Sequence, residues 1–180
     1  MNILLTGPRG SGKTSIGRIV ARSLGRPLVD MDALVLDLFD QATVTEVWSV
    51  LGEQAWREAE VQILEQVLQG SDQIISLGGG VPMIPQARRR IEAAQTAGQA
   101  VLLYLDCSLE TLTNRLRQAR ADGDDRPSLT GADVIDEVAA VLADRRPVYE
   151  ALANWTLHAD GTSIAQAAES VIDCIVTRAW

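Results

Sequence analysis

The sequence predicts an α/β fold of three layers, in which helices cover both faces of a five-stranded, mostly parallel sheet. Apolar runs of strand length alternate with amphipathic stretches along all 180 residues, which is typical of strand–helix repeats. Two of these runs, 73–77 and 100–105, are continuously apolar, as expected of strands buried on both faces. No repeat and no linker with a shift in composition interrupts the alternation, so residues 1–180 are expected to form a single domain.

The strands are expected at 2–6, 27–29, 73–77, 100–105 and 155–158. The helices are expected at 12–24, from 43 onward, at 53–69, 84–95, 109–119, 132–152 and 164–178. Gly25 and Pro27 end the first helix, because neither residue type continues a helix well. Thr43 and Glu46 have the spacing of a capping box, which predicts a helix start.

Bulk composition excludes several classes of protein. A net charge of −8 and a pI near 4.6 argue against nucleic acid as the main partner, since phosphate backbones bind basic surfaces. Cys107 and Cys174 lie far apart and fit no metal spacing, so they are expected to be buried thiols in a reducing cytoplasm. No apolar run approaches the ~20 residues that span a bilayer, and a strand from residue 2 leaves no room for a signal peptide. We therefore expect a soluble, cytoplasmic monomer that binds no membrane.

Residues 7–14, GPRGSGKT, match the phosphate-binding pattern G-x-x-x-x-G-K-[ST] between a predicted strand and a predicted helix. Glycines allow backbone N–H groups and the helix N-terminus to approach phosphates closely. Lys13 can reach the β and γ phosphates, and the Thr14 hydroxyl can ligate Mg²⁺. The pattern predicts a P-loop NTPase fold that binds its nucleotide through Gly10, Ser11, Gly12, Lys13, Thr14 and Ser15.

A GTPase is disfavoured because the sequence lacks an N-K-x-D guanine motif, whereas a single short domain suits a small-molecule kinase. Asp30 and Asp32 follow the second predicted strand, at the edge where α/β sheets bind ligands. Residues i and i+2 of a strand share a direction, so both carboxylates are expected to face the phosphate site. One could support Mg²⁺ and the other an acceptor hydroxyl. A turn or a helix N-cap is the alternative for this pair.

Further motifs follow in order: GEQAWREAE at 52–60, LGGG at 77–80, RPSL at 126–129 and RRPVY at 145–149. Together with the P-loop and the D-M-D segment, they resemble the shikimate kinase family over nearly the whole chain. This resemblance implies transfer of the γ-phosphoryl group of ATP to the 3-hydroxyl of shikimate, a step of chorismate and aromatic amino acid biosynthesis. ATP and shikimate are the implied partners, and Mg²⁺ is the implied cofactor.

The resemblance also implies roles for acidic and basic residues, in a substrate-binding region at about 30–60. Asp32 would hold the acceptor hydroxyl and help take its proton, and Asp30 would join Thr14 in supporting Mg²⁺. Arg57 and Arg145 would bind the substrate carboxylate, for which a guanidinium fork is well shaped. Glu60, one helical turn after Arg57, would hold that arginine in position.

Other roles implied by the resemblance concern the walls and the cover of the site. Gly78, Gly79 and Gly80 would present backbone N–H groups to the substrate. Trp48 and Trp56 would wall its ring, with burial in the core as the alternative. A mobile lid at about 117–131 would bring Arg126 over the transferring phosphate, with a plain surface loop as the alternative. Arg115 would stack on adenine.

The chain also departs from the family pattern. Val35 and Leu36 replace the usual isoleucine–glutamate pair, Ser128 replaces a leucine of the lid, and the lid is unusually acidic. The adenine-side arginine expected near Asp160 is missing, and His158, the only histidine, is expected to be structural. A kinase of another hydroxy acid such as gluconate, or a nucleotide-binding relative without catalysis, remains an alternative function.

Overall fold

The structure is a computed structural model that describes residues 1–40, 43–121, 134–178 and 180. It contains one five-stranded sheet with the strand order β2-β3-β1-β4-β5, and every strand pairing among the described residues is parallel. The strands are β1 (Asn2–Thr6), β2 (Leu28–Asp30), β3 (Ile74–Ser76), β4 (Ala100–Asp106) and β5 (Trp155–His158). Because β1 is central, the loop that follows it emerges at the middle of the carboxyl edge, where sheets of this kind bind ligands.

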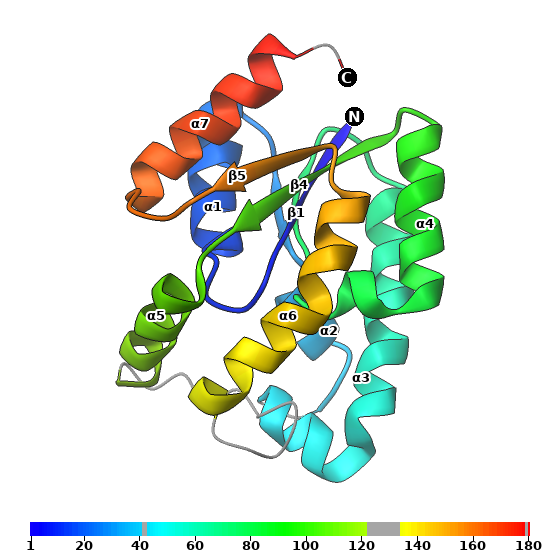
Figure 1. Ribbon diagram of the computed structural model, residues 1–180. Helices are drawn as coiled ribbons and strands as arrows, with labels where there is room; N and C mark the ends of the chain where they lie inside the picture. Colours follow the sequence, from blue (N-terminus) through cyan, green and yellow to red (C-terminus); the bar gives the residue numbers. More distant parts are fainter. Residues whose placement is uncertain (41–42, 122–133, 179) are drawn as a thin grey trace.

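Helices cover both faces of this sheet, as predicted (Figure 1). The α-helices are α1 (Lys13–Leu24), α2 (Met31–Leu36), α3 (Val44–Leu68), α4 (Pro85–Thr96), α5 (Leu109–Ala121), α6 (Val134–Leu152) and α7 (Ile164–Thr177). A 3₁₀ turn, η1 (Val81–Met83), follows β3. Helices α1 and α7 lie together on one face, and α3 and α4 lie on the other (Figure 1). The predicted three-layer α/β/α architecture is confirmed.

The central strand divides its apolar side chains between the two layers with a period of two. Ile3 and Leu5 pack into the core beneath α1 and α7, whereas Leu4 packs into the core beneath α3 and α4. All three side chains are fully buried. A strand covered on both faces is apolar at most of its positions, which explains the apolar runs in the sequence.

Two local differences from the sequence-based expectations lie in the substrate-binding region. A short helix, α2, begins directly after β2, where a turn was expected, and the Asp30 carboxylate caps it by accepting the Asp32 N–H at 3.1 Å. The two helices expected near 43 and 53–69 form one element, α3, which is kinked at Gly52 (φ +83°). The capping box of Thr43 and Glu46 is confirmed at its start.

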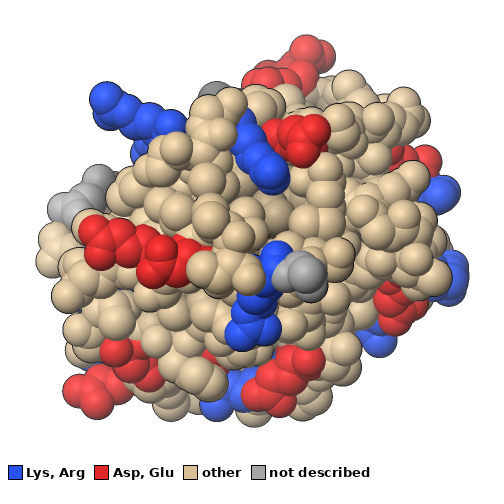
Figure 2. Space-filling model, turned by 90° about the horizontal axis from the view of Figure 1, so that it is seen from above, with Lys and Arg blue, Asp and Glu red and all other residues tan. Residues whose placement is uncertain are grey.

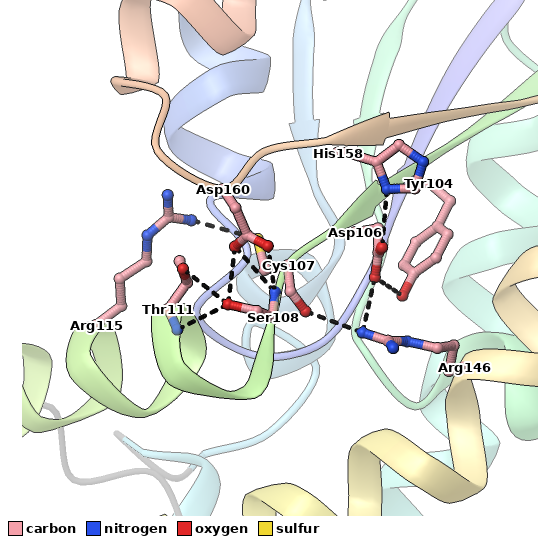
Figure 3. Close-up of polar contacts among 9 residues, drawn as sticks. All are labelled: Tyr104, Asp106, Cys107, Ser108, Thr111, Arg115, Arg146, His158 and Asp160. Carbon is pink, nitrogen blue, oxygen red and sulfur yellow. Dashed lines mark hydrogen bonds and ion pairs between the residues drawn. The ribbon is translucent and has the colours of Figure 1, made fainter.

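The ends of β4 and β5 are tied to α6 by a cluster of polar side chains (Figure 3). Asp106 accepts hydrogen bonds from Tyr104 Oη at 2.8 Å and from Arg146 Nη2 at 3.1 Å. Its second carboxylate oxygen lies 3.1 Å from the Nδ1 atom of His158, the only histidine of the sequence. Both cysteines are free and buried.

Charged side chains of both signs lie on the face of the protein that Figure 2 shows. On the face seen in Figure 2, acidic and basic side chains are interspersed and separated by uncharged surface. Among the helices of the described ranges, none combines the length and the apolar character needed to cross a bilayer.

Candidate active site

Two adjoining cavities lie along the phosphate-binding loop. The first, of about 300 Å³, is lined by Arg9, Gly10, Gly12, Lys13, Thr14, Ser15, Asp32, Ser76, Arg115, Leu116, Ala119 and Ile164. The second, of about 130 Å³, is lined by Pro8, Arg9, Lys13, Asp32, Val44, Trp48, Trp56, Arg57, Glu60, Gly79, Gly80, Leu116, Glu137, Val138, Val141, Leu142 and Arg145. Three polar residues, Arg9, Lys13 and Asp32, line both cavities. We call the first the nucleotide cavity and the second the acceptor cavity.

The nucleotide cavity is built mainly from the loop itself. Gly12 is the N-cap of α1 with φ +94°, and no side chain caps the helix there. The first N–H groups of α1 are therefore not occupied by a side-chain cap, as an anion site requires. Lys13 Nζ donates to the carbonyl oxygens of Gly7 at 2.9 Å and Pro8 at 3.0 Å, so it lies folded along the loop, beside the place predicted for the phosphates.

Three oxygen-bearing side chains meet beside the nucleotide cavity, which two of them, Thr14 and Ser76, line. Thr14 Oγ1 donates to Asp30 Oδ2 at 2.8 Å, and Ser76 Oγ on β3 lies 3.1 Å from Thr14 Oγ1. Mg²⁺ prefers oxygen ligands and keeps several waters, so two hydroxyls and one carboxylate beside a phosphate site fit this ion. Asp30 is thus both a helix cap and a neighbour of Thr14, the threonine predicted to ligate Mg²⁺, whereas the sequence presented these as alternatives.

The acceptor cavity holds a rigidly supported arginine. Arg57 Nη1 donates to Glu60 Oε2 at 2.8 Å, and its Nη2 donates to Glu53 Oε1 at 2.7 Å. The side chains of Arg57 and Glu60 are only 18% and 3% exposed. Such a pair loses hydration on burial, so its value is in fixing geometry more than in stabilising the fold.

Electrostatics keep Arg57 charged. Burial alone would lower the pKa of Arg57, but the charge and the hydrogen bond of Glu60, assisted by Glu53, raise the pKa above its ordinary value. Burial raises the pKa of Glu60, and the charge and hydrogen bond of Arg57 oppose that rise. The cavity therefore holds a permanent cation whose orientation is set by two carboxylates.

Adjacent arginines on α6 point to different places. Arg145 lines the acceptor cavity, as expected from the motif. Arg146 instead donates to Asp106 Oδ1 at 3.1 Å and to the Cys107 carbonyl at 3.2 Å (Figure 3). Residues one apart on a helix do not share a face, which explains this division.

The glycines after β3 lie close to charged side chains. Gly79 and Gly80 line the acceptor cavity. A Cβ on Gly80 would overlap Arg57 Nη1 where it now lies, so a larger residue at this position would displace the guanidinium. Gly78 is not among the described residues that line the cavity; a Cβ there would lie 2.6 Å from Glu60 Oε1 and 2.9 Å from Asp32 Oδ1. It lies behind the carboxylates rather than facing an acceptor.

Both predicted tryptophans line the acceptor cavity. Trp56 is 3% exposed and stacks on Phe39 with 6.3 Å between ring centroids. The Arg57 guanidinium lies over the ring of Trp48, with 5.6 Å between Arg57 Cζ and the ring centroid. The two alternatives weighed for Trp56, cavity wall and core residue, are therefore compatible.

Arg115 crosses from α5 to the phosphate loop. Its Nη1 donates to the carbonyl oxygens of Gly10 and Ser11, each at 3.3 Å, and to Cys107 Sγ at 3.6 Å. It lines the nucleotide cavity, but its contacts are with the loop. Arg126, Ser128 and most of the predicted lid at 117–131 lie outside the described residues, so the role given to Arg126 stays a prediction.

Sequence reasoning missed four residues near these cavities. Arg9 and Ser76 line the nucleotide cavity, and Glu137 is a buried carboxylate of the acceptor cavity. Tyr149 is fully buried and donates to the Gly79 carbonyl at 2.6 Å. Arg9 occupies a variable position of the loop pattern, and Ser76 directly precedes the LGGG motif. Tyr149 belonged to a recognised motif, yet the motif gave no role for its hydroxyl.

A phosphate loop that opens directly onto a small arginine-lined cavity defines a class of protein, the P-loop kinases of small molecules. Sequence comparison identifies the family. The sequence model described as "Shikimate kinase" matches residues 9–176, so the chain belongs to the shikimate kinase family, as the motifs predicted.

Relatives and solved structures agree with this assignment. The shikimate kinase of Symbiobacterium thermophilum is 35% identical, with 99% of this chain and 98% of that protein covered. The shikimate kinase of Chlorobium chlorochromatii is 36% identical over 94% of this chain and 87% of that protein. The crystal structure of shikimate kinase from Bacteroides thetaiotaomicron has a TM-score of 0.82 at 28% identity and 98% coverage of both chains. The fold also matches a shikimate-bound shikimate kinase from Acinetobacter baumannii, with a TM-score of 0.85, 24% identity and 98% and 93% coverage.

Proposed function

We propose that this protein transfers the γ-phosphoryl group of ATP to the 3-hydroxyl of shikimate, giving shikimate 3-phosphate for chorismate and aromatic amino acid biosynthesis. One observation carries the proposal: Lys13 and Asp32 line both cavities. Phosphoryl transfer needs donor and acceptor in line, with positive charge at the phosphates and a proton acceptor at the hydroxyl. The junction of the two cavities supplies a residue of each kind.

On the acceptor side, shikimate carries one carboxylate and three hydroxyls on a compact ring. Arg57 and Arg145 would bind the carboxylate, because two guanidinium groups in a small cavity suit a planar anion. Asp32 would then accept a hydrogen bond from the hydroxyl nearest the phosphate loop and take its proton as the new O–P bond forms. Trp48 and Trp56 would cover the apolar faces of the ring.

On the nucleotide side, the N–H groups of the loop and of α1 would bind the phosphates. Lys13 would turn from the Gly7 and Pro8 carbonyls to the phosphate oxygens. Thr14, with Asp30 and Ser76 around it, would hold Mg²⁺. When bound, this ion supplies positive charge that neutralises the phosphates.

Three features of the proposal rest on the sequence and the resemblance alone. The domain is taken as residues 1–180, with the P-loop at 7–14, the substrate-binding region at about 30–60 and the lid at about 117–131. Lid closure would exclude water, which would otherwise hydrolyse the γ-phosphate, and Arg126 would stabilise the transferring group. The enzyme is expected to act as a monomer in the cytoplasm.

The proposal is tested by measuring ADP release in a coupled assay with MgATP and either shikimate, gluconate or no acceptor. We expect turnover that depends on shikimate. Turnover with gluconate instead would support the alternative hydroxy-acid kinase. ATP binding without turnover on either acid would support a nucleotide-binding relative that has lost catalysis.

The role of Asp32 is tested by Asp32→Asn, which keeps the shape of the side chain but removes the proton acceptor. We expect kcat with shikimate to fall by about 10²- to 10⁴-fold while ATP binding persists. Asp37→Asn is the matched control, because Asp37 is exposed at the end of the same short helix and is not among the residues lining either cavity. Unchanged turnover in Asp32→Asn would remove Asp32 from the mechanism.

A further inference from the structure

The buried hydroxyl of Tyr149 lies beside two groups of the acceptor cavity, the Gly79 carbonyl and the Arg145 side chain. The residue is fully buried, and its Oη donates to the Gly79 carbonyl at 2.6 Å. Burial raises the pKa of Tyr149 to about 12, and the charge and hydrogen bonding of Arg145 oppose that rise. The hydroxyl therefore stays protonated at working pH and remains a donor to Gly79 while it lies beside Arg145.

The contact with Gly79 has a stereochemical consequence for the next peptide. A trans peptide is planar, so the Gly79 C=O and the Gly80 N–H point in opposite directions. By holding the carbonyl, Tyr149 fixes where the Gly80 N–H is aimed. In the described part of the chain, the N–H groups of Gly79 and Gly80 donate to no backbone carbonyl, although both residues line the acceptor cavity. These donors are available to a ligand.

The position of Tyr149 on its helix explains why it reaches both partners. It lies four residues after Arg145 on α6, so the two side chains share one face of the helix. Its ring packs on Tyr104, with 5.1 Å between the centroids, which restricts rotation of the phenol. Gly79, in turn, is wedged between elements: a Cβ there would lie 3.3 Å from the Gly7 carbonyl and 3.8 Å from Arg145 Nη1.

We propose that Tyr149 is a positioning residue for the acceptor, whose hydroxyl orients the Gly79–Gly80 peptide and the Arg145 guanidinium together. This inference rests on the proposed function, because the acceptor it positions is shikimate. Tyr149 does not itself line the acceptor cavity among the described residues; it acts through two groups that do. Without the hydroxyl, the peptide could rotate and Arg145 would lose one of its neighbours.

The test compares Tyr149→Phe with Tyr104→Phe. Both changes remove one hydroxyl from a fully buried tyrosine, but the Tyr104 hydroxyl bonds Asp106 and not the glycine turn. We expect Tyr149→Phe to raise the KM and the Kd for shikimate about tenfold, with the KM for MgATP unchanged and kcat within about threefold of wild type. Tyr104→Phe should lower the Tm as much as Tyr149→Phe does, but it should leave the shikimate KM unchanged.

Several outcomes would overturn the inference. Equal shikimate KM and Kd in Tyr149→Phe and wild type would show that the hydroxyl is structural only, and the proposed function would stand. An equal rise of the shikimate KM in both variants would also contradict it, because the effect would then follow from loosened packing. A wild-type protein that neither binds nor phosphorylates shikimate would remove the proposed function and this inference with it.

A second measurement does not depend on how well Tyr149→Phe folds. The chain has two tyrosines, so 3-fluorotyrosine incorporated into Tyr104→Phe labels position 149 alone. We expect its ¹⁹F resonance to shift when shikimate is added, because the acceptor contacts the peptide and the arginine beside the ring. A resonance that does not move at saturating shikimate would contradict the inference.

Discussion

The two sides of the site hold their charged groups in different ways. On the acceptor side, Arg57 and Glu60 form an ion pair whose side chains are 18% and 3% exposed. On the nucleotide side, two cations rest on backbone carbonyls of the phosphate loop: Lys13 donates to those of Gly7 and Pro8, and Arg115 to those of Gly10 and Ser11. The acceptor-side arginine is thus held by a buried carboxylate, whereas the nucleotide-side cations are held by the backbone of the loop.

The difference follows from what each ligand brings. A nucleotide carries several charges, and uncharged backbone N–H groups of one short loop can bind them. A small acceptor with one carboxylate offers few atoms to recognise. The protein must therefore supply fixed charges in a site of low dielectric, where each hydrogen bond discriminates strongly. We expect changes on the two sides to have separable effects on the two substrates.

The largest effect is expected for Lys13→Ala, which removes one of the two cations, Arg9 and Lys13, that line both cavities. Turnover should fall about 10³-fold, because charge that develops on the phosphates loses a preorganised partner. The Kd for shikimate should stay within about threefold of wild type. Fluorescence of the two cavity tryptophans, Trp48 and Trp56, can report shikimate binding independently of turnover. A loss of shikimate binding equal to the loss of turnover would break the distinction between the two sides.

The converse change is Arg57→Lys, which keeps the charge but loses the planar fork that contacts Glu53 and Glu60. We expect kcat/KM for shikimate to fall about 10²-fold while the KM for MgATP changes little. Steady-state kinetics with each substrate varied in turn would measure this. The exposed Arg90→Lys on α4, whose side chain is 52% exposed beside Glu65, is the control and should be silent. A matching rise in the KM for MgATP would contradict the separation.

The smallest effect is expected for Asp160→Asn, because Asp160 is exposed and contacts Ser108 just beyond the end of β4. The Ser108 N–H, assisted by Thr111 and by the Ser108 hydroxyl, lowers the pKa of Asp160. A carboxylate whose pKa is lowered on folding stabilises the protein above its unfolded pKa, and this contribution is lost as the pH falls through the folded value. The substitution should therefore lower the Tm by about 1–3 °C at pH 7, and by less as the pH falls from about 5 toward 3.

Thermal unfolding of wild type and Asp160→Asn across this pH range would test the sign. Asp173→Asn on α7 serves as the control for removal of an exposed carboxylate. A difference in Tm that stays constant with pH would show that the charge of Asp160 is not what stabilises the fold. Kinetics with shikimate should be unchanged, because Asp160 is not among the residues lining either cavity.

Some parts of the site could be predicted because they are local in sequence. Residues 7–14 form the phosphate loop from one uninterrupted segment, so its pattern carried its geometry. The pair Arg57 and Glu60 lies three residues apart on one helix, and its contact followed from helical spacing. Asp30 and Asp32 both reach the phosphate site, as expected, but they do so from the start of a helix and not from an extended strand. A helix begins at Met31, and it sends Asp30 to Thr14 and Asp32 to the junction of the cavities.

Sequence by itself determined the parallel sheet, the phosphate loop and the family, because apolar periodicity and short motifs are properties of neighbouring residues. It also named most of the acceptor residues, through the family resemblance. Only the tertiary structure decided which side chains meet. Ser76 reaches Thr14 across 62 residues, and Tyr149 reaches Gly79 across 70. Such contacts depend on the register of β3 beside β1 and on where α6 packs, and no local spacing encodes either.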